Sequence, residues 1–144
     1  ALVKAGGTPE NYPFWLLTAR SMQYAWGANV GMQLIKEVAD NVKGHRGVII
    51  NTGRARELGI GDGDQVEIAT PRHRVRGRAV LRQGIRPDTL LMLGQFDHWA
   101  TPFTKDFGVP SMNSLSAMSM ELTDATGSGA DIVRVRIAPT GKDS

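Results

Sequence analysis

The sequence predicts a mainly β fold with short helices, closed into a compact barrel. Residues 48–50 and 89–93 are short apolar runs with the composition of buried strands. In residues 74–82 and 131–137 apolar side chains alternate with polar ones, as in strands with one buried face. The helix expected after Ile50 is too short to cross over between the strands of a doubly wound sheet. A barrel with a helical insert fits these observations best.

Composition and length limit the class of protein. The chain has 144 residues, which predicts a single domain, and its net charge of +3 is only a weak indication of an anionic partner. It contains no cysteine, so disulfides and thiolate metal ligands are excluded. No apolar run approaches the ~20 residues of a membrane helix. The compartment, cytoplasmic or periplasmic, is not determined. Because the chain begins with Ala rather than Met, we expect a fragment of a longer protein, although a processed N-terminus would give the same start.

The first third of the chain is expected to supply an arm, a strand and a helix. Residues 1–13 form an arm or linker, and the barrel domain spans residues 14–138, followed by a tail at 139–144. The aromatic and apolar residues 14–18 predict a strand. After it, residues 21–31 lack a clear period and are interpreted as a loop. Residues 32–42 predict a short helix with an apolar stripe formed by Met32, Ile35, Val38 and Ala39.

The stretch from residue 48 to residue 68 has the clearest local pattern. Asn51 follows the first strand and is expected to cap the next helix through its side-chain oxygen. Gly59 has the position of a left-handed residue that ends this helix, with Ile60 folding back as the apolar contact. The Gly-Asp-Gly-Asp sequence at 61–64 predicts a tight turn rather than an acidic site. Val66 and Ile68 then point inward along a strand.

The second half predicts three more strands and a long loop. In residues 74–82 the apolar positions face inward and the arginines outward (Arg74, Arg76, Arg78, Arg82). Gly84-Ile85 before the strand at 89–93 resembles Gly59-Ile60, and this faint repeat predicts inward positions for Leu91 and Leu93. Residues 94–114 form a long loop with Phe96, His98, Trp99 and Phe103, a length typical of functional loops. A short helix carrying Leu115, Met118 and Leu122 and the strand at 131–137 follow.

Several self-contained sites are excluded by the sequence. The glycines at 59, 61 and 63 do not form a dinucleotide fingerprint, and there is no phosphate-binding P-loop. The three histidines are isolated, so a metal site built by this chain is not expected. A thiol nucleophile is impossible without cysteine, and no Gly-x-Ser-x-Gly elbow is present. We therefore predict no catalytic residues and no metal ligands in this chain.

The order of several segments resembles the C-terminal molybdopterin-dinucleotide-binding domain of molybdenum and tungsten oxidoreductases of the dimethyl-sulfoxide-reductase type. The resemblance extends over roughly residues 12–138, and the order and spacing of its segments are more specific than any one of them. The segments are 17–21 (LTARS), 48–51 (VIIN), 55–66 (ARELGIGDGDQV), 84–87 (GIRP), 98–99 (HW) and 113–116 (NSLS).

The resemblance implies a double-psi β-barrel and a role in binding two molybdopterin guanine dinucleotides, which hold one molybdenum or tungsten ion. The metal ligand and any iron–sulfur cluster are expected upstream of this domain, so the isolated domain should be inactive. Such a cofactor requires backbone amides, hydroxyls and cations at the strand ends, and the Arg20 guanidinium suits a two-pronged contact to phosphate or a pterin carbonyl. The implied cofactor-binding residues are Thr18, Ala19, Arg20, Ser21, Gln23, Tyr24, His98, Asn113 and Ser114.

Each of these residues has a plainer alternative. Arg20 could form a surface ion pair, and Gln23 and Tyr24 could be ordinary loop packing. His98 could be a structural histidine instead of a hydrogen-bond partner of the pterin. Asn113 and Ser114, which could recognise guanine or pterin edges, could instead cap the helix after them.

Two positions of the sequence depart from the family's usual pattern. Ala19 stands where the family often has Gly, and residues 130–132 lack a Lys that some members direct to the cofactor.

The expected partners are the remaining domains of a parent oxidoreductase, with an iron–sulfur electron-transfer subunit as a further candidate. Two other readings stay open: a small basic barrel that binds nucleic acid through its arginine-rich strand, which the resemblance argues against, and a protein-interaction barrel.

Overall fold

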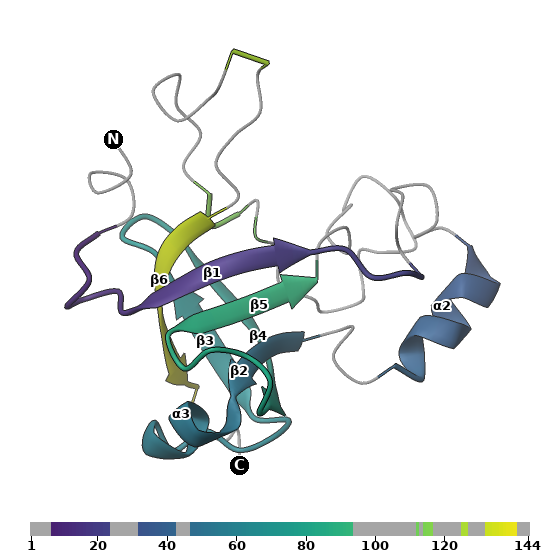
Figure 1. Cartoon of the computed structure of the whole chain (residues 1–144), viewed down its shortest axis with the longest axis horizontal. Coiled ribbons are helices and arrows are strands. Elements are labelled where there is room, and N and C mark those ends of the chain that lie inside the picture. The colour runs from purple at the N-terminus through teal and green to yellow at the C-terminus, as the bar shows by residue number, and fades with distance from the viewer. Residues whose placement is uncertain are drawn as a thin grey trace.

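In the part of the chain that the structure describes, the fold is a closed β-barrel with two short helices (Figure 1). The computed structural model describes residues 7–23, 32–42, 47–93, 112, 114–116, 125–126 and 132–140. Within these ranges the strands are β1 (Phe14–Ala19), β2 (Gly47–Asn51), β3 (Gln65–Ala69), β4 (Arg74–Arg82), β5 (Thr89–Leu93) and β6 (Ile132–Pro139). The helices are α2 (Gln33–Asp40) and α3 (Thr52–Glu57). The predicted class, mainly β with short helices, is confirmed.

The strands follow the order β1-β5-β2-β4-β3-β6 around the barrel. The pairs β1–β5 and β2–β4 are parallel, and the other four are antiparallel. Exchanging β1 with β4, β2 with β5 and β3 with β6 reproduces every one of these pairings with its direction. The two halves of the chain therefore interlock around a pseudo-twofold axis, as in the double-psi β-barrel that was predicted.

The sequence repeat does not coincide with this symmetry. Gly59-Ile60 precedes β3 and Gly84-Ile85 precedes β5, whereas the pseudo-twofold relates β3 to β6. The inward positions predicted from the repeat are also wrong in β5. Leu90 and Met92 are buried, and Leu91 and Leu93 are only half-buried. A strand that is apolar throughout has no alternation to set which side chains face the core.

The core is formed by inward side chains from every strand of the barrel. The alternations predicted for β3, β4 and β6 are confirmed, because Val66, Gly77, Ala79 and Val135 are buried while the residues beside them in sequence are at least partly exposed. β6 extends two residues beyond the predicted end at Ile137. The largest fully buried side chains are Phe14, Leu16, Val48, Ile50, Val66, Ile68, Leu90, Met92 and Val135.

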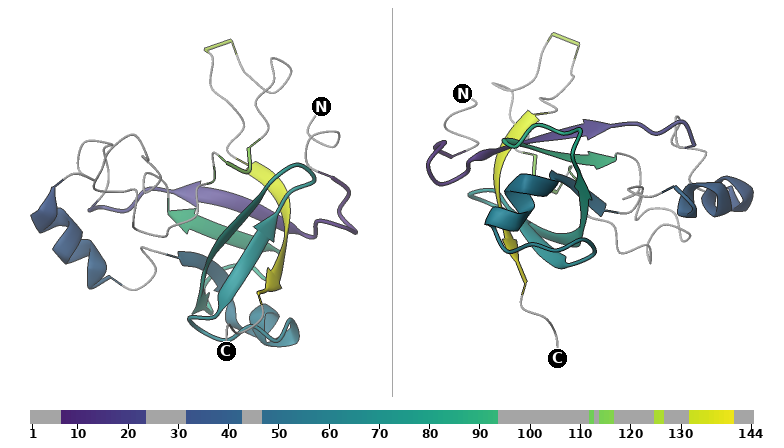
Figure 2. Two further views of the ribbon diagram at one scale, coloured as in Figure 1. Left: turned by 180° about the vertical axis from the view of Figure 1, so that it is seen from behind. Right: turned by 60° about the horizontal axis from the view of Figure 1, so that its bottom comes forward.

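α3 covers one end of the barrel (Figure 2, right). Asn51 caps it as predicted: its side-chain oxygen accepts a hydrogen bond from the Arg54 N–H at 3.1 Å. Gly59 ends this segment with a φ of 70°, and the Ile60 N–H donates to the Ala55 carbonyl at 2.8 Å. Ala55 and Ile60 are both buried in the core. The cap, the left-handed glycine and the apolar contact together tie α3 to the strands.

The Gly-Asp-Gly-Asp segment is a turn, as predicted. The Asp64 carboxylate accepts a hydrogen bond from the Gly61 N–H at 2.7 Å, so one aspartate holds the turn closed. The Asp62 carboxylate accepts from the Leu81 N–H of β4 at 2.9 Å. Gly63, at a φ of 88°, occupies the left-handed region that favours glycine. The Asp64 carboxylate therefore closes the turn, and the Asp62 carboxylate joins it to the barrel.

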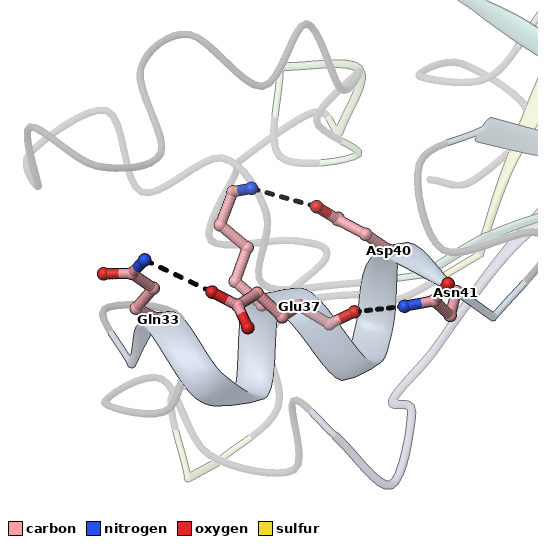
Figure 3. A network of polar contacts seen from close by, with 5 residues as sticks. Gln33, Glu37, Asp40 and Asn41 are labelled. Atoms are coloured by element: carbon pink, nitrogen blue, oxygen red, sulfur yellow. Dashed lines mark hydrogen bonds and ion pairs between the residues drawn. The ribbon is translucent and has the colours of Figure 1, made fainter.

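α2 lies to one side of the barrel (Figures 1 and 2). Of the predicted apolar stripe only Ala39 is buried, whereas Met32 and Val38 are exposed and Ile35 is half-buried. The stripe is therefore not a face of the barrel core. Its polar side carries local hydrogen bonds and an ion pair (Figure 3). No helix in the described part of the chain has the length and apolar character needed to cross a membrane.

Candidate functional site

Three strand ends meet at one edge of the barrel, on the side from which β1 leads toward α2 (Figure 1). Ala19, the last residue of β1, pairs with Leu93, the last residue of β5. Val48, near the start of β2, pairs with Met92 of β5. The chain therefore leaves β1 and β5 and enters β2 at neighbouring positions. We call residues 18–23, together with these strand ends, the β1 rim.

The β1 rim contains five of the nine predicted cofactor-binding residues, in one continuous segment. Thr18 and Ala19 close β1 and are half-buried, as are Ser21 and Gln23, while Arg20 is exposed. Arg20, Ser21 and Gln23 each already have an interaction partner within the chain. A ligand at this rim would thus replace existing contacts rather than fill vacant ones.

The other predicted site residues are not brought together with the rim. Tyr24, His98 and Asn113 lie outside the described residues, as do Met118 and Leu122 of the predicted helix. Ser114 is described and exposed, but among the described contacts none joins it to the β1 rim. Whether it shares one site with Arg20 stays a prediction.

The segment around Ser114 is anchored to the barrel by its neighbours. Met112 and Leu115 belong to the hydrophobic core. The backbone carbonyl of Met112 accepts hydrogen bonds from the Ser116 hydroxyl at 3.1 Å and from the Leu115 N–H at 2.9 Å. Ser116 therefore closes this turn, and Ser114 is presented on a fixed support.

The chemistry available at the β1 rim is that of binding. Residues 14–23 contain two hydroxyls, a guanidinium and an amide but no carboxylate. This donor set fits an anionic diphosphate and the polar edges of a heterocycle, because every charged group in it is positive. Within the described residues there is no group of three or more His, Cys, Asp or Glu side chains that could hold a metal ion.

A second concave feature lies at the opposite end of the barrel, and the sequence did not predict it. It is a groove of about 470 Å³ between the start of β1, the start of β5 and α3. The Arg54 guanidinium lies 5.6 Å from the centroid of the Phe14 ring and donates to Glu57 at 2.6 Å. The only signals in the sequence were Pro13 and Pro87, which line the groove and precede the two strands.

The polar groups of this groove are satisfied within the chain. The Asn51 amide donates to the Ile85 carbonyl at 2.8 Å, in addition to its capping bond. Hydrogen bonds from the Arg86 guanidinium lower the pKa of Asp88, against a smaller opposing effect of burial. The Thr89 hydroxyl also donates to Asp88, at 3.0 Å. The groove therefore has the features of a structural joint between α3 and the strands, and we do not assign it a ligand.

The fold and the rim define a β-barrel domain with a polar, carboxylate-free edge suited to an anionic ligand. The chain matches the family model described as "Molydopterin dinucleotide binding domain" over residues 14–136, so it belongs to that family. The resemblance found in the sequence is thereby confirmed. A search of curated proteins gave no match.

Solved structures show the same fold. A chain described as "Acetylene Hydratase from Pelobacter acetylenicus" superposes with a TM-score of 0.71 at 11% sequence identity, covering 92% of this chain and 19% of that chain. The present chain thus spans about a fifth of that protein's length. The computationally designed protein msDPBB_sym2 matches with a TM-score of 0.40 at 17% identity, covering 88% of this chain and 96% of that one, a likeness too weak to bear on the fold.

Proposed function

We propose that this chain is the cofactor-binding domain of a larger molybdenum or tungsten oxidoreductase, and that its β1 rim holds part of a molybdopterin guanine dinucleotide. The proposal is supported by the family to which residues 14–136 belong. Its main structural support is the continuous, carboxylate-free donor segment from Thr18 to Gln23 at the joint exit of β1 and β5. The domain adds no catalytic group of its own to the reaction.

In this proposal different residues of the rim bind different parts of the cofactor. The Arg20 guanidinium binds a diphosphate oxygen pair or a pterin carbonyl in a two-pronged contact. The Thr18 and Ser21 hydroxyls and the backbone amide of Ala19 bind polar edges of the same ligand. Gln23, Tyr24, His98, Asn113 and Ser114 complete the proposed set of contacts.

The parent enzyme supplies what this chain lacks. The metal ligand and any iron–sulfur cluster belong to upstream parts of the polypeptide in this proposal, and an iron–sulfur subunit is the proposed electron-transfer partner. The cysteine-free composition of the chain agrees with that division. The dinucleotide itself would supply the dithiolene sulfurs that bind the metal.

The test is the guanine nucleotide content of the purified parent enzyme after acid release of the cofactor. Arg20→Ala is expected to lower that content severalfold or more, because a charge-assisted hydrogen bond contributes about 1.5–3 kcal/mol. Arg20→Lys, which keeps the charge but loses the planar fork, is expected to lie between Arg20→Ala and wild type.

Arg56→Ala is the matched control, because Arg56 is an exposed arginine on α3, at the opposite end of the barrel. Its nucleotide content should equal that of the wild type. If Arg20→Ala and Arg56→Ala retain the same full content of guanine nucleotide, Arg20 does not bind the cofactor. If both lose it equally, the loss reflects general stability and the proposal for the rim fails.

A further inference from the structure

The outer face of β3, β4 and β6 carries an unusual concentration of arginine. Arg74, Arg76 and Arg78 are exposed at alternate positions of β4, and Arg136 is exposed on β6. Alternate residues of a strand lie roughly 7 Å apart, so the three side chains of β4 form one row. Arg136 pairs with Ala69 of β3, which pairs with Arg74 on its other side. We call these four residues the arginine face.

The arginine face has little compensating negative charge. Among the described residues of β3, β4 and β6 the one carboxylate is Glu67, which pairs in register with Arg76 and forms an ion pair with Arg74 at 3.5 Å. Within the described part of the chain, Arg76, Arg78 and Arg136 make no ion pair. Like charges this close repel one another, so an anionic partner would relieve the repulsion.

Several charges elsewhere in the described residues are paired with a neighbour along the chain. Arg54 pairs with Glu57 and Arg86 with Asp88, in each case within three residues along the chain. These pairs leave little field beyond themselves, whereas a row of arginines in which only Arg74 has a carboxylate partner projects a positive potential into the solvent. The face is also built entirely of arginine, whose planar fork matches a carboxylate in a two-pronged contact.

We propose that the arginine face is a docking surface for a separate protein that presents a row of carboxylates. The Glu67–Arg74 pair is an example of the required contact within the face itself. Trp15 of β1, which pairs in register with Arg134 of β6, is already covered by the Arg134 guanidinium at 3.8 Å and is therefore not available to stack a base.

None of the exposed large apolar side chains of the described residues lies on the arginine face, which points to a separate partner rather than to another domain of the same polypeptide. Permanent interfaces are apolar at their centre, while salt-sensitive, reversible ones rely on charge. On this face Ala69, between Arg74 and Arg136, is buried. The exposed large apolar side chains lie instead on α2 or next to it in the sequence (Met32, Leu34, Val38, Val42) and in the β1 rim (Met22).

The first test uses the 144-residue chain and a short synthetic peptide in which glutamate and threonine alternate. Titration is followed through the Nε–H signals of the arginines in NMR spectra. The signals of Arg76, Arg78 and Arg136 are expected to shift most, and the shifts should disappear at about 0.5 M salt, where the Debye length is near 4 Å. An oligothymidylate with the same number of charges should bind several times more weakly.

The matched variants carry the same change in net charge at different places. The variant Arg76→Gln/Arg78→Gln/Arg136→Gln is expected to lower the affinity for the peptide about tenfold or more, as for the loss of several charge contacts. The variant Lys36→Gln/Arg56→Gln/Arg86→Gln should change it less than about twofold. Circular dichroism would verify that both fold, and Arg76→Lys/Arg78→Lys/Arg136→Lys should retain intermediate affinity.

Three outcomes of the titration would overturn the proposal. Tighter binding of the oligothymidylate than of the peptide would identify a nucleic-acid surface instead. Equal losses in the two glutamine variants would show that only the net charge matters. No shift at low salt would show that the face binds no carboxylates.

A second test distinguishes a separate partner from another domain, and this arm alone rests on the proposed function. Phenylglyoxal modification of the parent enzyme is followed by mass spectrometry of its peptides. Arg76, Arg78 and Arg136 are expected to react as readily as the exposed Arg56. Protection of these three arginines in the isolated parent enzyme would mean that a domain of the same polypeptide covers the face.

Discussion

α2 and α3 are both short helices, yet they are held in opposite ways. α3 has a side-chain cap from Asn51, a buried Ala55 and contacts with β2 and β4. α2 has no side-chain cap bond, and the Lys36–Asp40 ion pair and the Gln33–Glu37 hydrogen bond are internal to it. The comparison shows that α3, the six-residue helix, is stabilised by its contacts with the barrel. α2, the eight-residue helix, depends on the side-chain pairs within it and on the contacts made by its apolar edge.

The position of α2 beside the β1 rim gives this contrast a functional meaning. The rim contains Met22, which is 92% exposed, and α2 carries Leu34, which is 71% exposed. Apolar side chains grouped in this way usually mark a contact with another part of a protein. In the proposed oxidoreductase, α3 belongs to the self-contained end of the domain and α2 to the end that the remaining domains would meet.

The largest expected effect comes from the apolar contact that ends the α3 segment. Ile60→Ala should lower the free energy of unfolding by about 2–5 kcal/mol, because Ile60 is buried and its loss leaves a cavity. Leu34→Ala on α2 should cost less than about 0.5 kcal/mol, as for an exposed residue. Urea unfolding of the 144-residue chain measures both, and similar costs would show that the edge of α2 is buried in solution.

An intermediate effect is expected from the cap of α3. Asn51→Ala should cost about 2 kcal/mol, since it removes the bond from the Arg54 N–H and leaves the Ile85 carbonyl without its amide donor. Met32→Ala, at the corresponding position of α2, should cost less than about 0.5 kcal/mol because no cap bond exists there. Thermal and urea unfolding give both values.

Asn51→Asp sharpens this comparison. The carboxylate still accepts from the Arg54 N–H but cannot donate to the Ile85 carbonyl. The free energy of unfolding of Asn51→Asp should therefore lie between that of the wild type and that of Asn51→Ala. If Asn51→Asp is as unstable as Asn51→Ala, the bond to the loop before β5, rather than the helix cap, is the main contribution of Asn51.

The smallest effect is expected from the ion pair on α2. Lys36→Ala should cost about 0.3–0.5 kcal/mol in low salt and nearly nothing in high salt, because the pair with Asp40 is exposed and screened. Arg54→Ala on α3 should cost more in both conditions, since Arg54 also packs over the Phe14 ring. Unfolding in urea at two salt concentrations tests this, and an equal salt dependence of the two costs would contradict it.

The local features were predictable because each depends on residues close in sequence. The Asn51 cap, the left-handed Gly59 and the turn at Asp62 and Asp64 all follow from the chemistry of short segments. The continuous part of the candidate site, from Thr18 to Gln23, was predictable for the same reason. The extension of the site to Ser114 stays a prediction, because no local pattern states which distant segments meet.

The sequence by itself determined the short elements, the outward row of arginines on β4 and, through the order of its motifs, the family. Only the tertiary structure decided that Leu90 and Met92 face the core, that β1 and β5 end side by side, and that Arg136 joins the row from β4. The reason is physical. Caps, turns and alternation arise from neighbours along the chain, whereas strand phase and the meeting of strand ends depend on pairing between residues far apart in sequence.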